Sequence, residues 1–283
     1  MSEDLHVDPN SRRHLSTLAL LNSIYCHRQL IYTLAKKDIL SRYKGALMGV
    51  IWAFITPLLT LTIYTFVFSE IFKVRWNGEN ASNSKLEFAL IIFSGMIIFT
   101  FFSEIINRST TIISSNVNYV KKVIFPLEIL PIILLCEAGF HALVSLGILL
   151  SLIVFIGTGT AKNIYLLPLL FAPLIFLCLG LSFFLASIGV YIKDINQAIG
   201  SITAILMFLS PIFFPLSAVP EQFQKLIKLN PLTFIIENFR NVLFFDSTLD
   251  ITGLLTYSLF SLLILILGYY FFQKTRKGFS DVL

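Results

Sequence analysis

Six long apolar runs recur along the chain, separated by short polar stretches. They cover residues 48–72, 86–106, 127–156, 164–192, 198–219 and 251–272. An α-helix rises about 1.5 Å per residue, so it needs roughly 20 apolar residues to cross a hydrocarbon core about 30 Å thick. The pattern therefore predicts an all-α integral membrane protein with six transmembrane helices.

A further apolar stretch, residues 220–245, is interrupted by Asn230-Pro231. The pieces on either side of this dipeptide are each too short to cross the bilayer. We expect a re-entrant helical hairpin between the fifth and sixth spans, turning at Asn230 and Pro231. Because broken backbone at membrane depth is tolerated only where protein buries it or a water-filled cavity receives it, the hairpin indicates a translocation path.

A segment that mixes apolar and basic residues precedes the first run. Within 24–44, Ile24, Ile31 and Leu34 recur at helical spacing, and lysines and arginines follow them. Such side chains keep their charge among lipid headgroups while their stems cover apolar surface. The segment predicts an amphipathic interfacial helix, with an ordinary basic flank as the alternative. We expect residues 1–23 to form a cytosolic tail and 24–283 to form one transmembrane domain.

The charged residues indicate the orientation. They make up 13% of the chain, against roughly 25% in soluble domains, and the net charge of +5 comes from basic residues that flank apolar runs. This placement indicates lipid contact and excludes a nucleic-acid surface. Lysine and arginine are twice as frequent on the side of the N-terminal region and the tail as on the other. Both termini are therefore predicted to be cytoplasmic and the hairpin to lie on the outer side.

The sequence offers little material for catalysis or metal binding. It lacks the G-x-x-x-x-G-K-[ST] loop, so it does not bind ATP by that route. Three of the four histidines precede the first apolar run, and Cys26, Cys136 and Cys178 lack metal-ligand spacing. We expect this chain to bind no cofactor and no metal.

Glu137 and His141 lie within the third run. They are four residues apart, hence on one face of a helix inside the membrane. Polar groups there usually face protein or water, because exposure to lipid is costly. A proton-coupled site is one interpretation. A hydrogen bond within or between helices is the interpretation we favour, because no second carboxylate–histidine pair continues a relay.

Aromatic side chains gather near the outer ends of the first and fifth runs. Tyr64 and Phe68 lie in the first, and Phe213 and Phe214 lie in the fifth. Flat apolar rings can stack on sugar rings, so these four are candidate channel or glycan contacts. Lipid contact or helix packing is the alternative for each ring.

The connection between the second and third runs, residues 113–125, is short and polar. It predicts an exposed, partly helical elbow that suits docking of another protein, with Pro126 marking the start of the next helix. The candidate contact residues are Ser115, Asn116, Asn118, Tyr119, Lys121 and Lys122.

Several segments together resemble the membrane subunits of polysaccharide-exporting ATP-binding-cassette transporters, the O-antigen and capsule class. The resemblance covers nearly the whole chain from about residue 28. The residues that carry it are KDILSRYK at 37–44 followed by Leu47, Gly49, Trp52 and Pro57; YVKKVIFP at 119–126; SPIFFP at 210–215; Asn230-Pro231-Leu232 with Glu237 and Arg240; and Phe279 and Asp281 in the tail.

The resemblance implies a permease rather than an enzyme, located in the bacterial inner membrane. Two copies of this chain would form a pore for a lipid-linked (polyprenyl diphosphate) polysaccharide. Two copies of a separate subunit would hold ATP and Mg and dock on the elbow, which then acts as the coupling helix. The lipid head group would enter near Lys37, Arg42 and Lys44, and Glu237 and Arg240 would pair or mark the polymer exit.

Two alternatives remain at this point. A teichoic-acid or small-molecule exporter would share the same architecture. A membrane-embedded transferase acting on polyprenyl sugars would need a set of catalytic carboxylates and histidines, for which Glu137 and His141 alone are sparse.

Overall fold

The structure is a computed structural model that describes residues 17–67, 85–121, 125–157, 161–245 and 249–283. These residues form helices and connecting turns, with no β-strand among them. The α-helices are α2 (Thr17–Cys26), α3 (Arg28–Arg42), α4 (Trp52–Tyr64), α5 (Lys85–Ser109), α6 (Val117–Lys121), α7 (Ile129–Ile156), α8 (Leu167–Tyr191), α9 (Ile195–Leu209), α10 (Glu221–Leu229), α11 (Pro231–Arg240), α12 (Ile251–Thr275) and α13 (Phe279–Val282).

Five helical stretches among the described residues are long and apolar enough to cross a membrane. They are Gly49–Val67, Leu86–Ser109, Ile129–Ile156, Asn163–Tyr191 and Ile251–Val282. They correspond to the first four predicted runs and the last, and residues 68–72 of the first run lie outside the described residues. The prediction of an all-helical membrane protein is confirmed at this level.

The fifth predicted span, 198–219, does not form one continuous helix, because only its first part lies in α9. Helix α9 ends at Leu209, and Ser210 adopts an extended conformation. Two prolines follow, Pro211 and Pro215, and each lacks the N–H that a helix interior requires. With 15 residues, α9 reaches about 22 Å, short of a full hydrocarbon core.

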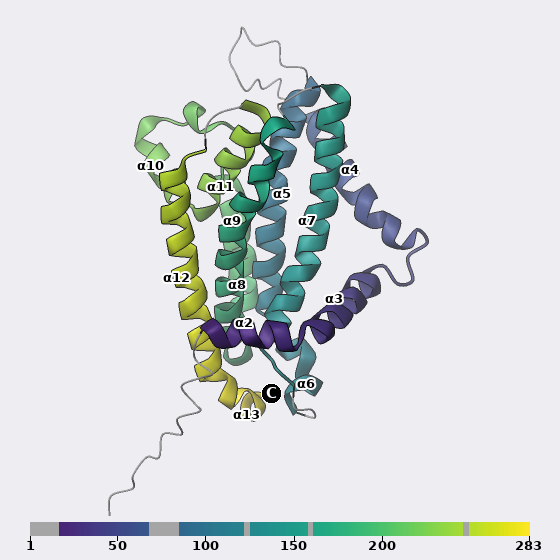
Figure 1. Cartoon of the computed structure of the whole chain (residues 1–283), viewed down its shortest axis with the longest axis vertical. Coiled ribbons are helices and arrows are strands. Elements are labelled where there is room, and N and C mark those ends of the chain that lie inside the picture. Colours follow the sequence, from purple (N-terminus) through teal and green to yellow (C-terminus); the bar gives the residue numbers. More distant parts are fainter. Residues whose placement is uncertain (1–16, 68–84, 122–124, 158–160, 246–248) are drawn as a thin grey trace, which may run out of the picture.

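The hairpin region divides where the sequence predicts. Helix α10 ends before Asn230, whose side-chain oxygen accepts a hydrogen bond from the Leu232 N–H and so caps α11. Pro231 occupies the first turn of α11, where a missing N–H costs nothing. A short π-helical segment, Asn241–Phe245, continues α11. In Figure 1, α10 and α11 lie at the end of the bundle opposite α6 and α13.

Helix α5 is the centre of the bundle. It contacts α4, α7, α8, α9 and α11, and its membrane-length stretch is largely buried. Helices α8 and α12 approach especially closely. A Cβ atom placed on Gly268 of α12 would lie 2.0 Å from the carbonyl oxygen of Gly180 in α8. The small residues therefore determine how near these two helices come.

The N-terminal helices cross the end of the bundle where α6 and α13 also lie (Figure 1). Ile31 and Ala35 are the buried residues of α3, which packs against α7. Residues 17–23, predicted as tail, instead belong to helix α2, because buried Leu20 and the partly buried Ile24 join an apolar cluster. Residues 1–16 of the predicted tail lie outside the described residues.

Candidate functional site: an ionic cluster between two hollows

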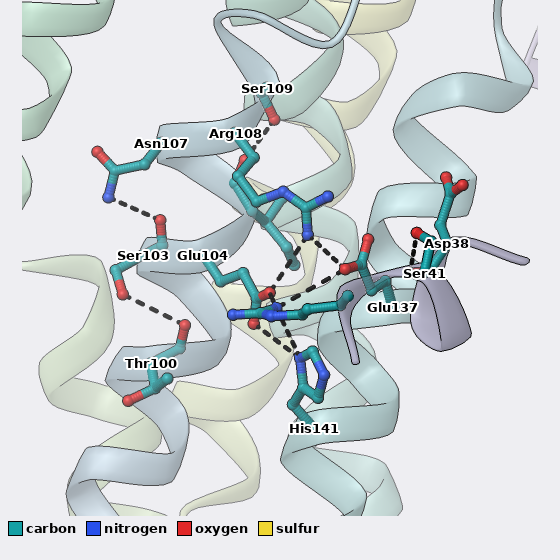
Figure 2. Close-up of polar contacts among 12 residues, drawn as sticks. Asp38, Ser41, Thr100, Ser103, Glu104, Asn107, Arg108, Ser109, Glu137 and His141 are labelled. Atoms are coloured by element: carbon teal, nitrogen blue, oxygen red, sulfur yellow. Dashed lines mark hydrogen bonds and ion pairs between the residues drawn. The ribbon is translucent and has the colours of Figure 1, made fainter. Parts of the chain in front are cut away.

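Three helices bring charged and polar side chains together inside the bundle (Figure 2). Helix α5 provides a glutamate and an arginine four residues apart, and α7 provides a glutamate and a histidine with the same spacing. Since residues four apart share one helix face, each pair points toward the other helix. The last turn of α3 and the residue after it complete the set. We call the following residues the ionic cluster: Arg42, Tyr43, Glu104, Arg108, Glu137 and His141.

The two arginines share the two carboxylates of the ionic cluster. Arg108 Nη1 lies 2.8 Å from Glu137 Oε1 and 3.3 Å from Glu104 Oε1. Arg42 hydrogen-bonds Glu104, and its Nη1 lies 3.7 Å from Glu137 Oε1. Two guanidinium charges therefore face two carboxylate charges, and the cluster is balanced. The carboxylates are largely buried, whereas the side chains of Arg42 and Arg108 are 47% and 41% exposed.

His141 joins the interfacial segment to the bundle. Its Nδ1 lies 3.2 Å from Glu104 Oε2, and its Nε2 lies 3.0 Å from the Tyr43 hydroxyl. Nδ1 also lies 3.3 Å from Arg42 Nη1, so a carboxylate and a guanidinium group both meet one ring nitrogen while the Tyr43 hydroxyl meets the other. The favoured interpretation of His141 and Glu137, hydrogen bonding between helices, is thus confirmed. Glu104 and Arg108 were missed, although their i, i+4 spacing was a readable signal.

Two hollows lie on either side of the ionic cluster. The bundle hollow, about 210 Å³, lies among α4, α5 and α7, and its polar lining includes Thr56, Thr60, Thr100 and Ser145 beside the cluster residues. The elbow hollow, about 560 Å³, lies between α3, α5, α7 and the segment before α6. Its lining residues are Asp38, Ser41, Arg42, Arg108, Thr111, Ile112, Ser115, Asn116 and Glu137. Arg42 lines both hollows, so the cluster lies at their junction.

The predicted docking elbow has two different faces. Its described part consists of the 3₁₀ turn Ser114–Asn116 and α6, while Lys122 lies outside the described residues. The exposed residues are Ser114, Ser115, Asn118 and Lys121. Tyr119 points to the protein side, where its ring stacks on Phe125 at 4.4 Å, and α6 contacts α13. Asn116 donates to the Ile112 carbonyl at 2.9 Å and thereby holds the turn.

The three basic residues predicted at the head-group entrance differ in their surroundings. Lys37 and Lys44 are exposed. Arg42 is engaged by the ionic cluster. Asp38, beside Lys37, lines the elbow hollow, and burial together with the nearby Glu137 raises the pKa of its carboxyl. The structure thus separates two exposed lysines from an arginine that is paired with buried carboxylates.

Of the four predicted channel aromatics, two are in contact with each other in the structure. The rings of Tyr64 and Phe213 meet edge to face with centroids 6.0 Å apart, which joins the end of α4 to the segment after α9. Phe214, next to Phe213, is half-buried. Phe68 lies outside the described residues.

The hairpin residues are held by hydrogen bonds. Asn230 Nδ2 lies 2.8 Å from Ser210 Oγ, which ties the start of α11 to the end of α9. Glu237 and Arg240 face each other at 3.7 Å, as their spacing predicts. Arg240 is 1% exposed and donates to the carbonyl oxygens of Ile91, Pro211 and Ile212. In this chain, its guanidinium group is buried in protein, away from the surface.

No group of three histidine, cysteine or carboxylate side chains lies close enough to hold a metal ion within the described ranges. In the ionic cluster, partly exposed guanidinium groups face buried carboxylates, so the cluster has the materials for binding and releasing charged groups. Its arginines are reachable from the elbow hollow, and its carboxylates are not freely exposed.

Comparison with known proteins gives a consistent picture. Residues 29–244 match the family described as ABC-2 type transporter. The chain is 22% identical to the O-antigen export system permease protein RfbA of Myxococcus xanthus, over 93% of this chain and 99% of that protein. It is 22% identical to RfbA of Klebsiella pneumoniae over 90% of this chain and 95% of that protein. It is 25% identical to the polysialic acid transport protein KpsM of Escherichia coli, over 86% of this chain and 92% of that protein.

Proposed function

Because the chain belongs to the ABC-2 type transporter family, we propose that it is the membrane subunit of an ATP-driven exporter of a lipid-linked polysaccharide. The observation that carries this proposal is the end-to-end similarity to permeases named for O-antigen and polysialic acid export. Family membership makes the chain a transport permease rather than an enzyme, which decides against the polyprenyl-sugar transferase. A teichoic-acid or small-molecule cargo is the weaker alternative, because the similar permeases carry polysaccharide names.

The proposed assembly is a homodimer of this chain with two copies of an ATP-binding subunit, located in the bacterial inner membrane. Both termini face the cytoplasm and the α10–α11 hairpin faces outward as a re-entrant element. Helix α9 and residues 210–219, which include the 3₁₀ turn Leu216–Ala218, then provide the fifth of six crossings. The placement of α10 and α11 opposite α6 and α13 supports this topology (Figure 1).

The test of the proposal is reconstitution with the ATP-binding subunit. We expect the two chains to co-purify and to hydrolyse ATP faster when a candidate lipid-linked glycan is added in nanodiscs. In cells, deletion of the gene should leave the lipid-linked glycan inside the inner membrane and remove it from the surface. Failure to co-purify with any ATP-binding subunit would contradict the central claim.

The exposed face of the elbow should carry the contact with the ATP-binding subunit. Replacing Lys121 by glutamate reverses a charge on that face without touching the Tyr119–Phe125 stack. We expect affinity for the ATP-binding subunit to fall about tenfold, about 1.4 kcal/mol, as measured by surface plasmon resonance. Lys228→Glu, an exposed change in α10 at the opposite end, is the control and should leave affinity unchanged. Equal loss in both variants would argue against the elbow as the docking surface.

The two exposed lysines of the interfacial region should attract the anionic head group. Each lysine near a charged membrane surface contributes about 1 kcal/mol, so replacing both Lys37 and Lys44 by glutamine should cost about 2 kcal/mol. We expect weaker stimulation of ATP hydrolysis by the lipid-linked glycan at limiting concentrations. Lys225→Gln with Lys228→Gln removes the same charge from α10 and is the matched control. A wild-type response in the Lys37 and Lys44 double variant would remove these residues from the entrance.

A further inference from the structure

The elbow hollow joins the interfacial helix to the coupling elbow. Its volume of about 560 Å³ falls within the range of small-molecule sites, roughly 300 to 1,000 Å³. Asp38, Ser41 and Arg42 line it from α3, whereas Ser115 and Asn116 line it from the elbow. A ligand bound there would touch the helix that lies along the membrane surface and the turn proposed to receive the ATP-binding subunit.

The donors around the elbow hollow suit a phosphate group. Two guanidinium groups, Arg42 and Arg108, lie at its inner wall and are substantially exposed. Guanidinium groups bind phosphate oxygens through paired, charge-assisted hydrogen bonds. Hydroxyl groups of Thr111 and Ser115 and the amide of Asn116 add neutral polar groups on the elbow side. Such a set is richer in phosphate donors than a lysine pair on an open surface.

Glu137 occupies the place that a phosphate would take. Its Oε1 lies 2.8 Å from Arg108 Nη1 and 3.7 Å from Arg42 Nη1, so one oxygen faces both cations. The Glu137 side chain is only 3% exposed, whereas both arginines can be reached from the hollow. Glu104 contacts both arginines as well and would remain as a counter-ion. The Glu137 carboxylate therefore positions the guanidinium groups of Arg42 and Arg108 side by side.

Asp38 is the acidic residue on the rim of the hollow. Burial and the charge of Glu137 both raise the pKa of its carboxyl, while Lys37 and Arg108 act in the opposite direction. An anion that enters the hollow passes this carboxylate, whose charge is offset in part by Lys37 and Arg108.

We infer that the elbow hollow is a diphosphate-binding site, in which the head group of the lipid-linked substrate replaces Glu137 as counter-ion of Arg42 and Arg108. The inference rests on the proposed function and deepens it. It moves the centre of head-group binding from the exposed lysines to the arginine pair. It also gives Glu137 a role, that of an internal competitor which releases the arginines only to a more highly charged ligand.

The inference predicts opposite effects from two neutralising substitutions. Arg108→Gln removes a charge-assisted contact and should weaken binding of undecaprenyl diphosphate about tenfold or more. Glu137→Gln removes the competitor and should strengthen binding roughly threefold or more. Binding is measured with the purified permease–ATP-binding complex in nanodiscs, and the melting temperature of each variant is recorded alongside. Arg28→Gln, an exposed change in α3, is the control and should bind like wild type.

Further probes separate the sources of the phosphate. Undecaprenyl monophosphate and inorganic pyrophosphate are compared with undecaprenyl diphosphate. We expect the diphosphate lipid to bind best and inorganic pyrophosphate to compete with it. Pyrophosphate binding as tight as that of the lipid would overturn the assignment to a lipid head group.

The remaining outcomes also decide the question. Weakened or unchanged binding by Glu137→Gln at a wild-type melting temperature would overturn the inference. If Glu137→Gln does not fold, Arg108→Lys keeps the charge but loses the paired geometry, and wild-type affinity in that variant would overturn it equally. Binding is measured without transport, so a complex that binds the lipid but exports nothing would contradict the proposed function and leave this inference standing.

Discussion

Replacing Arg240 by methionine should prevent stable folding of the permease. Its Nε lies 3.1 Å from the Ile91 carbonyl oxygen and its Nη2 lies 2.6 Å from that of Ile212, while Nη1 binds Pro211. Two of these carbonyls belong to the non-helical backbone after α9, where no helix partner can replace the guanidinium group. The Ile91 carbonyl keeps the Ser94 hydroxyl as a donor at 2.7 Å, so two carbonyls, those of Pro211 and Ile212, lose their partner. A buried polar group left without a partner costs about 1–3 kcal/mol, so the two together exceed what most single substitutions remove.

The measurement is the fraction of variant recovered as a monodisperse species after detergent extraction, together with its melting temperature. Arg28→Met removes the same charge from an exposed site on α3 and should behave like wild type. Arg240→Lys should fall between the two, because an ammonium group cannot reach three separated carbonyls with a planar fork. Wild-type recovery and melting of Arg240→Met would contradict the role assigned to these hydrogen bonds.

The second large effect is expected where α8 and α12 cross. A Cβ on Gly268 would lie 2.0 Å from the Gly180 oxygen, and one on Gly180 would lie 2.6 Å from the Ile264 backbone. Gly268→Leu must therefore push two backbones apart, because no flexible side chain can yield. We expect a loss of about 3 kcal/mol or more, with Gly268→Ala less severe, as measured by thermal unfolding in detergent.

Gly147 in α7 is the matched control for the helix crossing. It is also a helical glycine, but a Cβ there would meet open space. Gly147→Ala should leave the melting temperature unchanged or raise it slightly, since alanine favours a helix by about 1 kcal/mol over glycine. If Gly147→Ala and Gly268→Leu destabilise the protein equally, close packing of α8 on α12 is not the cause.

Much of the helical outline could be read from apolar periodicity and run length. The break at Asn230-Pro231 was also predictable, because proline suits the first turn of a new helix and asparagine suits the cap before it. The polar elbow around Ser115 was recognised for the same local reason. These features depend on residues close together in the chain, where length and backbone chemistry decide the result.

The end of α9 shows where that approach fails. Hydropathy treats 198–219 as one run, although the chain leaves the helix at Ser210. Non-helical backbone can persist there because Arg240 binds the carbonyls of Pro211 and Ile212. Both prolines can be read in the sequence. The sequence does not reveal that Arg240 of α11 donates hydrogen bonds to the backbone carbonyls of Pro211 and Ile212.

The sequence by itself determined that this is a helical membrane protein with a broken apolar stretch, because burial of the backbone in lipid demands long helices and penalises every interruption. Only the tertiary structure decided which charges meet. Glu104 and Arg108 on α5, Glu137 and His141 on α7, and Arg42 at the end of α3 are brought together by packing of distant segments. Coulomb attraction depends on distance in space and not along the chain, so the ionic cluster and the two hollows it separates became visible only in three dimensions.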